Sequence, residues 1–212
     1  METSLALHWV RTAAEQRAIY LQVYREATDE VEDLAPHLEA GTWAVALDAD
    51  ETVIDNSLYN AEREALGLGY TPESWAGWVE RRQAPPLPGA VDFLERVHQL
   101  GGLIAIVTNR RDEHCPATGD NFRKYDIPFD VMLCKTDTGR KEPRWRSVEE
   151  GTAAPDLPPL DIVLWVGDNI QDFPGGEQAW RTGPAEDLEG FGSRYFVLPN
   201  PMYGSWMSNE WW

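Results

Sequence analysis

The sequence is poor in cysteine and contains no long hydrophobic run. Its 212 residues include only two cysteines, Cys115 and Cys134, whose spacing matches neither a metal-ligand motif nor a disulfide framework. We therefore expect two ordinary thiols, with Cys134 at the end of a buried strand. No apolar stretch approaches the ~20 residues that a helix needs to cross a bilayer, which excludes a membrane-spanning helix.

Basic residues are also scarce. The chain has 18 Lys and Arg against 36 Asp and Glu, a formal net charge of −18. Such a surface repels DNA and RNA backbones, so no nucleic-acid polymer is expected as a partner. It also repels phosphorylated small molecules, which makes any local cluster of lysine and arginine informative.

The first residues, Met-Glu-Thr-Ser-Leu-Ala-Leu-His, lack the basic region and the apolar length of a signal peptide. We expect either a cytosolic protein or a chain from which a leader has been removed.

Apolar periodicity predicts an α/β fold in one domain, 1–212. Residues 4–34 carry an apolar stripe at helical spacing, which predicts a helix within an N-terminal extension, 1–40. Five short apolar runs then predict strands at 43–47, 103–107, 129–134, 162–166 and 194–198. Helical segments at 91–100, 113–125 and 143–150 lie between them. Most runs are continuously apolar, as in parallel strands covered on both faces.

The segment 56–88 interrupts this alternation. It has a helix-prone composition and ends in the stiff sequence Ala84-Pro-Pro-Leu-Pro88. We interpret it as a small helical cap inserted after the first strand.

Polar residues follow the strands of the predicted sheet, where ligands bind in open α/β folds. Asp48-Ala-Asp-Glu-Thr52 follows the first strand and Thr108-Asn-Arg-Arg111 the second. Lys135 follows the third, with Lys141 a few residues on, and Gly167-Asp-Asn-Ile-Gln-Asp-Phe173 follows the fourth.

This inventory fits the cleavage of phosphate esters. A carboxylate can attack phosphorus as a nucleophile, a role that suits Asp48, and a second acid, Asp50, can protonate the departing alkoxide. Mg²⁺ held by oxygen ligands would neutralise the charge, with Asp168 as a distal ligand and Asp172 in support. Thr108 and a lysine would complete the donors around the phosphoryl oxygens.

Each motif alone also has a simpler interpretation. Asp-x-Asp-x-Thr can be a surface turn, and a strand-end threonine, a Gly-Asp turn and a solvated lysine are common. A calcium-binding loop requires glycine at its sixth position, where this chain has Val53, so that alternative fails. The order of all four motifs at consecutive strand ends favours the catalytic interpretation.

These residues resemble the haloacid dehalogenase (HAD) superfamily and, within it, the class C (subclass IIIB) acid phosphatases. The stretches 48–59 and 163–173 are similar to the two diagnostic motifs of that subclass, and similarity extends over the leading helix, 88–93 and 199–206. The resemblance implies a doubly wound, Rossmann-like core, Mg²⁺ as cofactor, and hydrolysis of phosphate monoesters, often nucleoside 5′-monophosphates.

The resemblance also implies roles for individual residues. Asp48 is the nucleophile and Asp50 the acid/base, and the metal ligands are the Asp48 carboxylate, the Asp50 carbonyl and Asp168. Lys141, in Lys-Glu-Pro-Arg144, matches the family's lysine better than Lys135 does. Ala49 and Ile170 depart from the usual residues but stay apolar. Members are usually exported with a signal peptide, which implies a periplasmic or secreted protein here.

Aromatic residues predict a site for the leaving group. We expect Trp75, in the cap, and Tyr203, in the C-terminal loop, to stack a nucleobase or aryl group, although Trp75 can instead pack the cap on the core. Asn109 and Arg110 are expected to contact the substrate. Arg110 and Arg144 are candidates for local positive potential.

Three competing functions use the same scaffold. A phosphotransferase would pass the phosphoryl group to another acceptor, and a phosphonatase requires a cap lysine that 56–88 lacks. A storage or binding protein would lack the nucleophile, whereas Asp48 and Asp50 are both present. The tail 206–212 has apolar surface suited to a homodimer interface or to packing on its own domain.

Overall fold

The structure is a computed structural model, and it describes residues 3–210. Trp211 and Trp212, part of the predicted apolar tail, lie outside the described residues. Trp206 and Met207 of the same tail are exposed, and a homodimer interface there stays a prediction. No helix in the described part of the chain is long and apolar enough to span a membrane.

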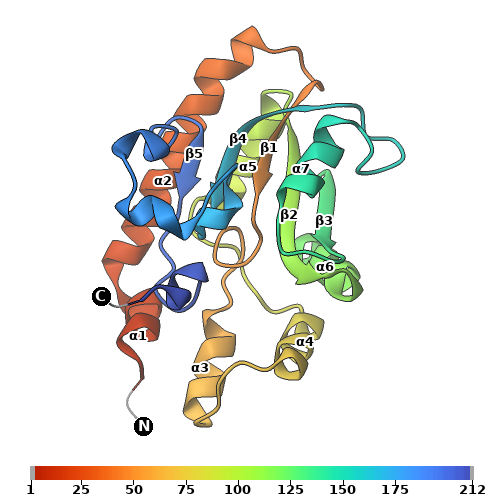
Figure 1. Cartoon of the computed structure of the whole chain (residues 1–212). Coiled ribbons are helices and arrows are strands. Elements are labelled where there is room, and N and C mark those ends of the chain that lie inside the picture. Colours follow the sequence, from red (N-terminus) through yellow and green to blue (C-terminus); the bar gives the residue numbers. More distant parts are fainter. Residues whose placement is uncertain (1–2, 211–212) are drawn as a thin grey trace.

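A parallel five-stranded sheet forms the centre of the molecule, in the order β3-β2-β1-β4-β5 (Figure 1). All neighbouring strands pair in parallel, which confirms the predicted α/β fold. The strands are β1 Trp43–Leu47, β2 Leu103–Arg111, β3 Val131–Lys135, β4 Asp161–Gly167 and β5 Tyr195–Val197. The chain proceeds outward from β1 to β3 on one side and from β4 to β5 on the other, so β1 and β4 flank the switch point where such folds bind ligands.

Seven α-helices accompany the sheet in residues 3–210. They are α1 Leu5–Thr12, α2 Ala14–Leu34, α3 Ser57–Ala65, α4 Pro72–Arg81, α5 Ala90–Gln99, α6 Cys115–Lys124 and α7 Glu142–Glu149. The single helix predicted over 4–34 is therefore wrong in one respect. Ala13 has an extended backbone (φ −78°, ψ 130°), which separates α1 from α2.

Both faces of the sheet are buried, and β1 shows how its side chains alternate. Trp43, Val45 and Leu47 point into a core that includes residues of α2 and α5. Ala44 and Ala46 belong to a second core, which includes Trp145 of α7. The period-2 alternation of a strand explains why the run is apolar at every position.

The segment with α3 and α4 lies beyond the carboxyl ends of the strands, at the bottom of Figure 1. Its two connections run side by side, because Asp55 N donates to Pro85 O (2.8 Å) and Leu87 N donates to Val53 O (2.9 Å). Asn121 of α6 also hydrogen-bonds both the amide and the carbonyl of Ala84. The stiff Ala84–Pro88 sequence is thus fixed to the core.

Two sequence-based expectations need correction. Cys115 and Cys134 form a disulfide that joins the first residue of α6 to β3, because the fold brings together residues whose spacing carries no disulfide signal. In addition, β2 does not end at Val107 but continues to Arg111, with its pairing to β3 interrupted between those residues. Thr108, Asn109 and Arg110 therefore belong to the strand.

Candidate active site

Asp48 is the first residue after β1, and a buried lysine contacts it. Its amide N donates to Val166 O of β4 (3.1 Å), which fixes the residue beside the central strands. Lys141 Nζ contacts Asp48 Oδ1 and lies 2.7 Å from Asp172 Oδ1. The Lys141 side chain is only 2% exposed. Of the two lysines considered, Lys141 is the one that the structure places against Asp48.

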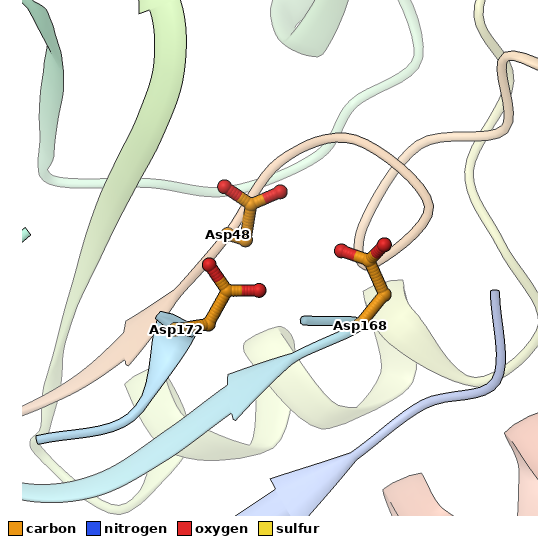
Figure 2. Close-up of side chains that lie close together, drawn as sticks. All are labelled: Asp48, Asp168 and Asp172. Carbon is orange, nitrogen blue, oxygen red and sulfur yellow. The ribbon is translucent and has the colours of Figure 1, made fainter. Parts of the chain in front are cut away.

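Three carboxylates converge on the same point. Asp48, Asp168 and Asp172 each offer an oxygen, and these oxygens lie within 4.8 Å of one another. Figure 2 shows the three side chains close together, at the ends of β1 and β4 and in the short 3-10 helix Ile170–Asp172. The sequence predicted support from Asp172 for the metal ligands, and the structure places its carboxylate in the cluster itself.

Burial makes this cluster electrostatically unfavourable without more positive charge. It raises the pKa of the Asp48 carboxyl to about 7, opposed by Lys141 and reinforced by the Asp172 and Asp50 carboxylates. Burial, followed by the Asp172 and Asp48 carboxylates, raises the pKa of Asp168 well above its usual range. Burial alone would lower the pKa of Lys141, but Asp172 and Asp48 raise it instead.

The donor set fits a hard divalent cation. Mg²⁺ prefers oxygen ligands and binds through a few carboxylates, and one lysine neutralises only one of three charges here. Asp168 is fixed from outside the cluster, since Asn200 Nδ2 donates to its Oδ2 (2.8 Å) and Thr52 Oγ1 to its Oδ1 (3.3 Å). The Asp50 carbonyl, also a predicted ligand, accepts no hydrogen bond from residues 3–210.

Asp50 does not turn toward the cluster. Its carboxylate is held by Arg110, with Nη2 at 2.7 Å and Nε at 3.0 Å from Oδ1, and by Asn56 Nδ2 at 2.8 Å. The Arg110 side chain is 2% exposed. Arg110 therefore positions Asp50, and its expected contact with substrate stays a prediction.

Sequence reasoning missed a buried polar network behind Asp50. Asn56 donates to the Glu51 carboxylate through its amide N (2.9 Å) and accepts from the Trp78 indole on α4 (2.7 Å). Burial, followed by the Asp50 carboxylate, raises the pKa of Glu51 well above its usual range. The network joins α4 to the loop that follows Asp48.

Two tyrosines of α2 hold the same loop. Tyr20 Oη donates to Glu51 O (2.6 Å), and Tyr24 Oη donates to Thr52 O (2.8 Å). Glu51 has a left-handed backbone (φ 53°), which is unfavourable for a residue with a side chain. The N-terminal helices therefore stabilise the turn that carries Asp50.

Thr108 and its neighbours form the wall on the β2 side. Thr108 is buried, and its Oγ1 accepts from Arg110 N (3.2 Å). Arg144 of α7 contacts the Thr108 carbonyl and donates to Asn109 Oδ1 (2.7 Å). Burial lowers the pKa of Arg144, yet the residue keeps a positive charge beside Asn109 because arginine deprotonates only at very high pH.

The two predicted stacking residues lie in different surroundings. Trp75 packs edge-on against Tyr59, with ring centroids 5.0 Å apart, and lies 5.3 Å from the Arg110 guanidinium. It also lines a cavity with Tyr70, Asn109 and Arg110. Tyr203 does not line this cavity. Its backbone amide donates to Asn200 Oδ1 (3.4 Å), and its buried hydroxyl has no hydrogen-bond partner in the described residues.

Comparison with known proteins identifies the family. The model for the HAD superfamily, subfamily IIIB (acid phosphatase) matches residues 4–206. The chain belongs to this family. Its members are phosphate monoester hydrolases, and the IIIB assignment agrees with the resemblance noted in the sequence.

Individual relatives of this IIIB acid phosphatase match over nearly its full length. The class C acid phosphatase from Bacillus anthracis is 33% identical, with a TM-score of 0.84 over 95% of this chain and 85% of that one. A structure of the class C enzyme from the same organism with tungstate bound is 31% identical, with a TM-score of 0.82 and the same coverage. Acid phosphatase 1 from Solanum lycopersicum is 24% identical over 96% of this chain and 80% of the relative.

Proposed function

We propose that this acid phosphatase hydrolyses phosphate monoesters through a covalent phosphate on Asp48, with Mg²⁺ as its cofactor. The observation that supports this proposal most directly is that Asp48, Asp168 and Asp172 converge on one point beside a buried lysine. A carboxylate fixed at the end of a central strand beside a buried lysine is placed to act as a nucleophile, which supports the covalent route.

The cation would be held by Asp48, Asp168 and the Asp50 carbonyl. When bound, it supplies positive charge that neutralises the phosphoryl oxygens and orients the phosphate. Lys141 and Thr108 are the proposed protein donors to those oxygens, and Asp172 fixes Lys141.

The proposed reaction has two halves. In the first, an Asp48 oxygen forms a bond to phosphorus, the ester P–O bond breaks, and Asp50 gives a proton to the departing alkoxide. In the second, Asp50 takes a proton from water, the water oxygen attacks phosphorus, and the bond to Asp48 breaks. Asp50 must leave Arg110 to reach the leaving group, so we propose that the ion pair opens when substrate binds.

The cavity beside Arg110 supports an aromatic leaving group. It has a volume of about 270 Å³ and is walled by Trp75 and Tyr70, enough for one or two rings. We propose that these two residues, and not Tyr203, contact a nucleobase or aryl group, as in nucleoside 5′-monophosphates. The tungstate in the structure of the Bacillus anthracis relative, an oxyanion similar to phosphate, supports a phosphate ester as the substrate.

We also propose that the protein acts in an oxidising compartment, either the periplasm or the cell exterior. The Cys115–Cys134 disulfide supports this location, because disulfides persist where thiols are not kept reduced.

Phosphate release from p-nitrophenyl phosphate tests the proposal. We expect activity with Mg²⁺, loss of activity in EDTA, and loss in Asp48→Asn. Asp161→Asn is the matched control, because it removes the same charge at the amino end of β4, where the side chain is exposed. Full activity in EDTA would exclude the metal role, and full activity in Asp48→Asn would exclude the covalent route.

A further inference from the structure

Two basic residues near the proposed site, Arg111 and Lys135, have no role in the chemistry above, and we call them the basic rim. Arg111 of β2 and Lys135 of β3 are direct partners in the parallel pairing of these strands. Two positive charges on neighbouring strands repel each other, and both attract an anion. Lys135 makes no ion pair within residues 3–210, and Arg111 reaches only Glu113, at 3.6 Å between exposed side chains.

Both cations line the same cavity as Trp75 and Tyr70. His114, whose side chain is 13% exposed, adds a third basic group. Asn109 and Arg110 line the same cavity, and Arg110 binds Asp50. The cavity therefore brings aromatic and basic side chains together beside Asp50.

Acidic residues offset this charge only in part, since Glu113 Oε1 lies 3.6 Å from both Arg111 Nη1 and His114 Nε2. Glu73 and Glu113 also line the cavity, but no ion pair within 4.0 Å joins Glu73 to Lys135 or Arg111. Lys135 therefore has no ion-pair partner in residues 3–210, and in a chain with a net charge of −18 such a cation attracts anions that the rest of the surface repels.

We propose that this cavity binds a second anionic group, carboxylate or phosphate, carried by the leaving group of the substrate. Lys135 and Arg111 are the residues that select it. This inference rests on the proposed phosphatase function and narrows its substrates to monoesters whose aromatic or nucleoside leaving group bears another negative charge.

The test compares substrate pairs that differ in this charge. One pair is 4-carboxyphenyl phosphate and its neutral isostere 4-carbamoylphenyl phosphate, and a longer pair is adenosine 3′,5′-bisphosphate and adenosine 5′-monophosphate. For at least one pair, we expect kcat/KM to be higher for the charged member by about fivefold, and the preference to fall as salt is added. The carboxylate pair and the phosphate pair distinguish the two anion sources.

Variants test whether the basic rim causes the preference for the charged substrate. Lys135→Gln is expected to abolish the preference for the charged substrate while leaving kcat/KM for the neutral substrate unchanged. Glu73→Gln is expected to increase that preference. Lys124→Gln is the control, because Lys124 is an exposed lysine at the end of α6 that does not line the cavity. Its Nζ donates to the Arg82 carbonyl. Equal kcat/KM within both pairs, or a preference that survives in Lys135→Gln, would overturn the inference. If none of the four esters is hydrolysed, the phosphatase proposal itself is overturned.

Discussion

Replacing Lys141 by methionine is the most demanding perturbation of the site. Met has a similar length but no charge, so the variant leaves Asp48, Asp168 and Asp172 within 4.8 Å of one another without their cation. Removing one partner of a buried ion pair destabilises a protein by about 3–5 kcal/mol. For a domain of this size, each kcal/mol lowers Tm by roughly 2–4 °C, so we expect a decrease of about 6–20 °C in EDTA.

Thermal unfolding of Lys141→Met in EDTA at pH 5 and pH 8 measures this effect. The loss should be larger at pH 8, because the raised pKa of Asp48, about 7, leaves that carboxyl mostly protonated at pH 5. Adding Asp172→Asn should restore part of the stability, since it removes one unpaired carboxylate. Lys124→Met, at an exposed site, is the control. A Tm equal to that of the wild type at pH 8 would refute the account of the charge balance.

Other predictions address the metal, the disulfide, the loop and the aromatic wall. The folded pKa of Asp48 lies above its unfolded value of 3.8, so the stability that this carboxyl contributes without metal is lost as pH rises from about 4 to about 7. Mg²⁺ should therefore raise Tm more at pH 8 than at pH 5. An equal increase in Tm at both pH values would contradict this. Cys115→Ser, in chemical unfolding, should cost about 3 kcal/mol, the value for a loop of this length, and a stability unchanged by the substitution would count against the bond. Tyr24→Phe leaves the Thr52 carbonyl without its partner and should cost about 1–3 kcal/mol and weaken Mg²⁺ binding in calorimetry, whereas unchanged Mg²⁺ affinity would reduce it to a purely structural contact. Trp75→Ala should lower kcat/KM for aryl phosphates about tenfold more than for an alkyl phosphate, and equal losses would remove the stacking role.

The fold was predictable from the sequence because each strand is a continuous apolar run. In β1, every residue is buried against one of two cores, so the run is apolar throughout. The break at Ala13 was not predictable, since alanine favours helix and the extended backbone there depends on how α1 packs. The apolar stripe likewise placed Tyr20 and Tyr24 on one face of the helix but could not indicate what their hydroxyls bind.

The candidate site was predictable where its residues follow strands directly. Asp48 and Asp168 come from adjacent parallel strands, and their carboxyl ends necessarily meet at one edge of the sheet. Asn200 and the Cys115–Cys134 bond were not predictable, because both depend on distant segments meeting in three dimensions. Asn56 follows the first motif closely, but its position between Asp50 and Glu51 depends on a turn with a left-handed residue.

Rapid acid quench followed by mass spectrometry tests the central claim most directly. Asp50→Asn, which lacks the base for the second half-reaction, is mixed with p-nitrophenyl phosphate and Mg²⁺ and quenched within the first turnover. We predict one phosphoryl group on the peptide that contains Asp48, in an amount equal to the nitrophenol released, and none in a variant that also carries Asp48→Asn. Nitrophenol release without a phosphorylated Asp48 peptide, at any quench time, would contradict the account.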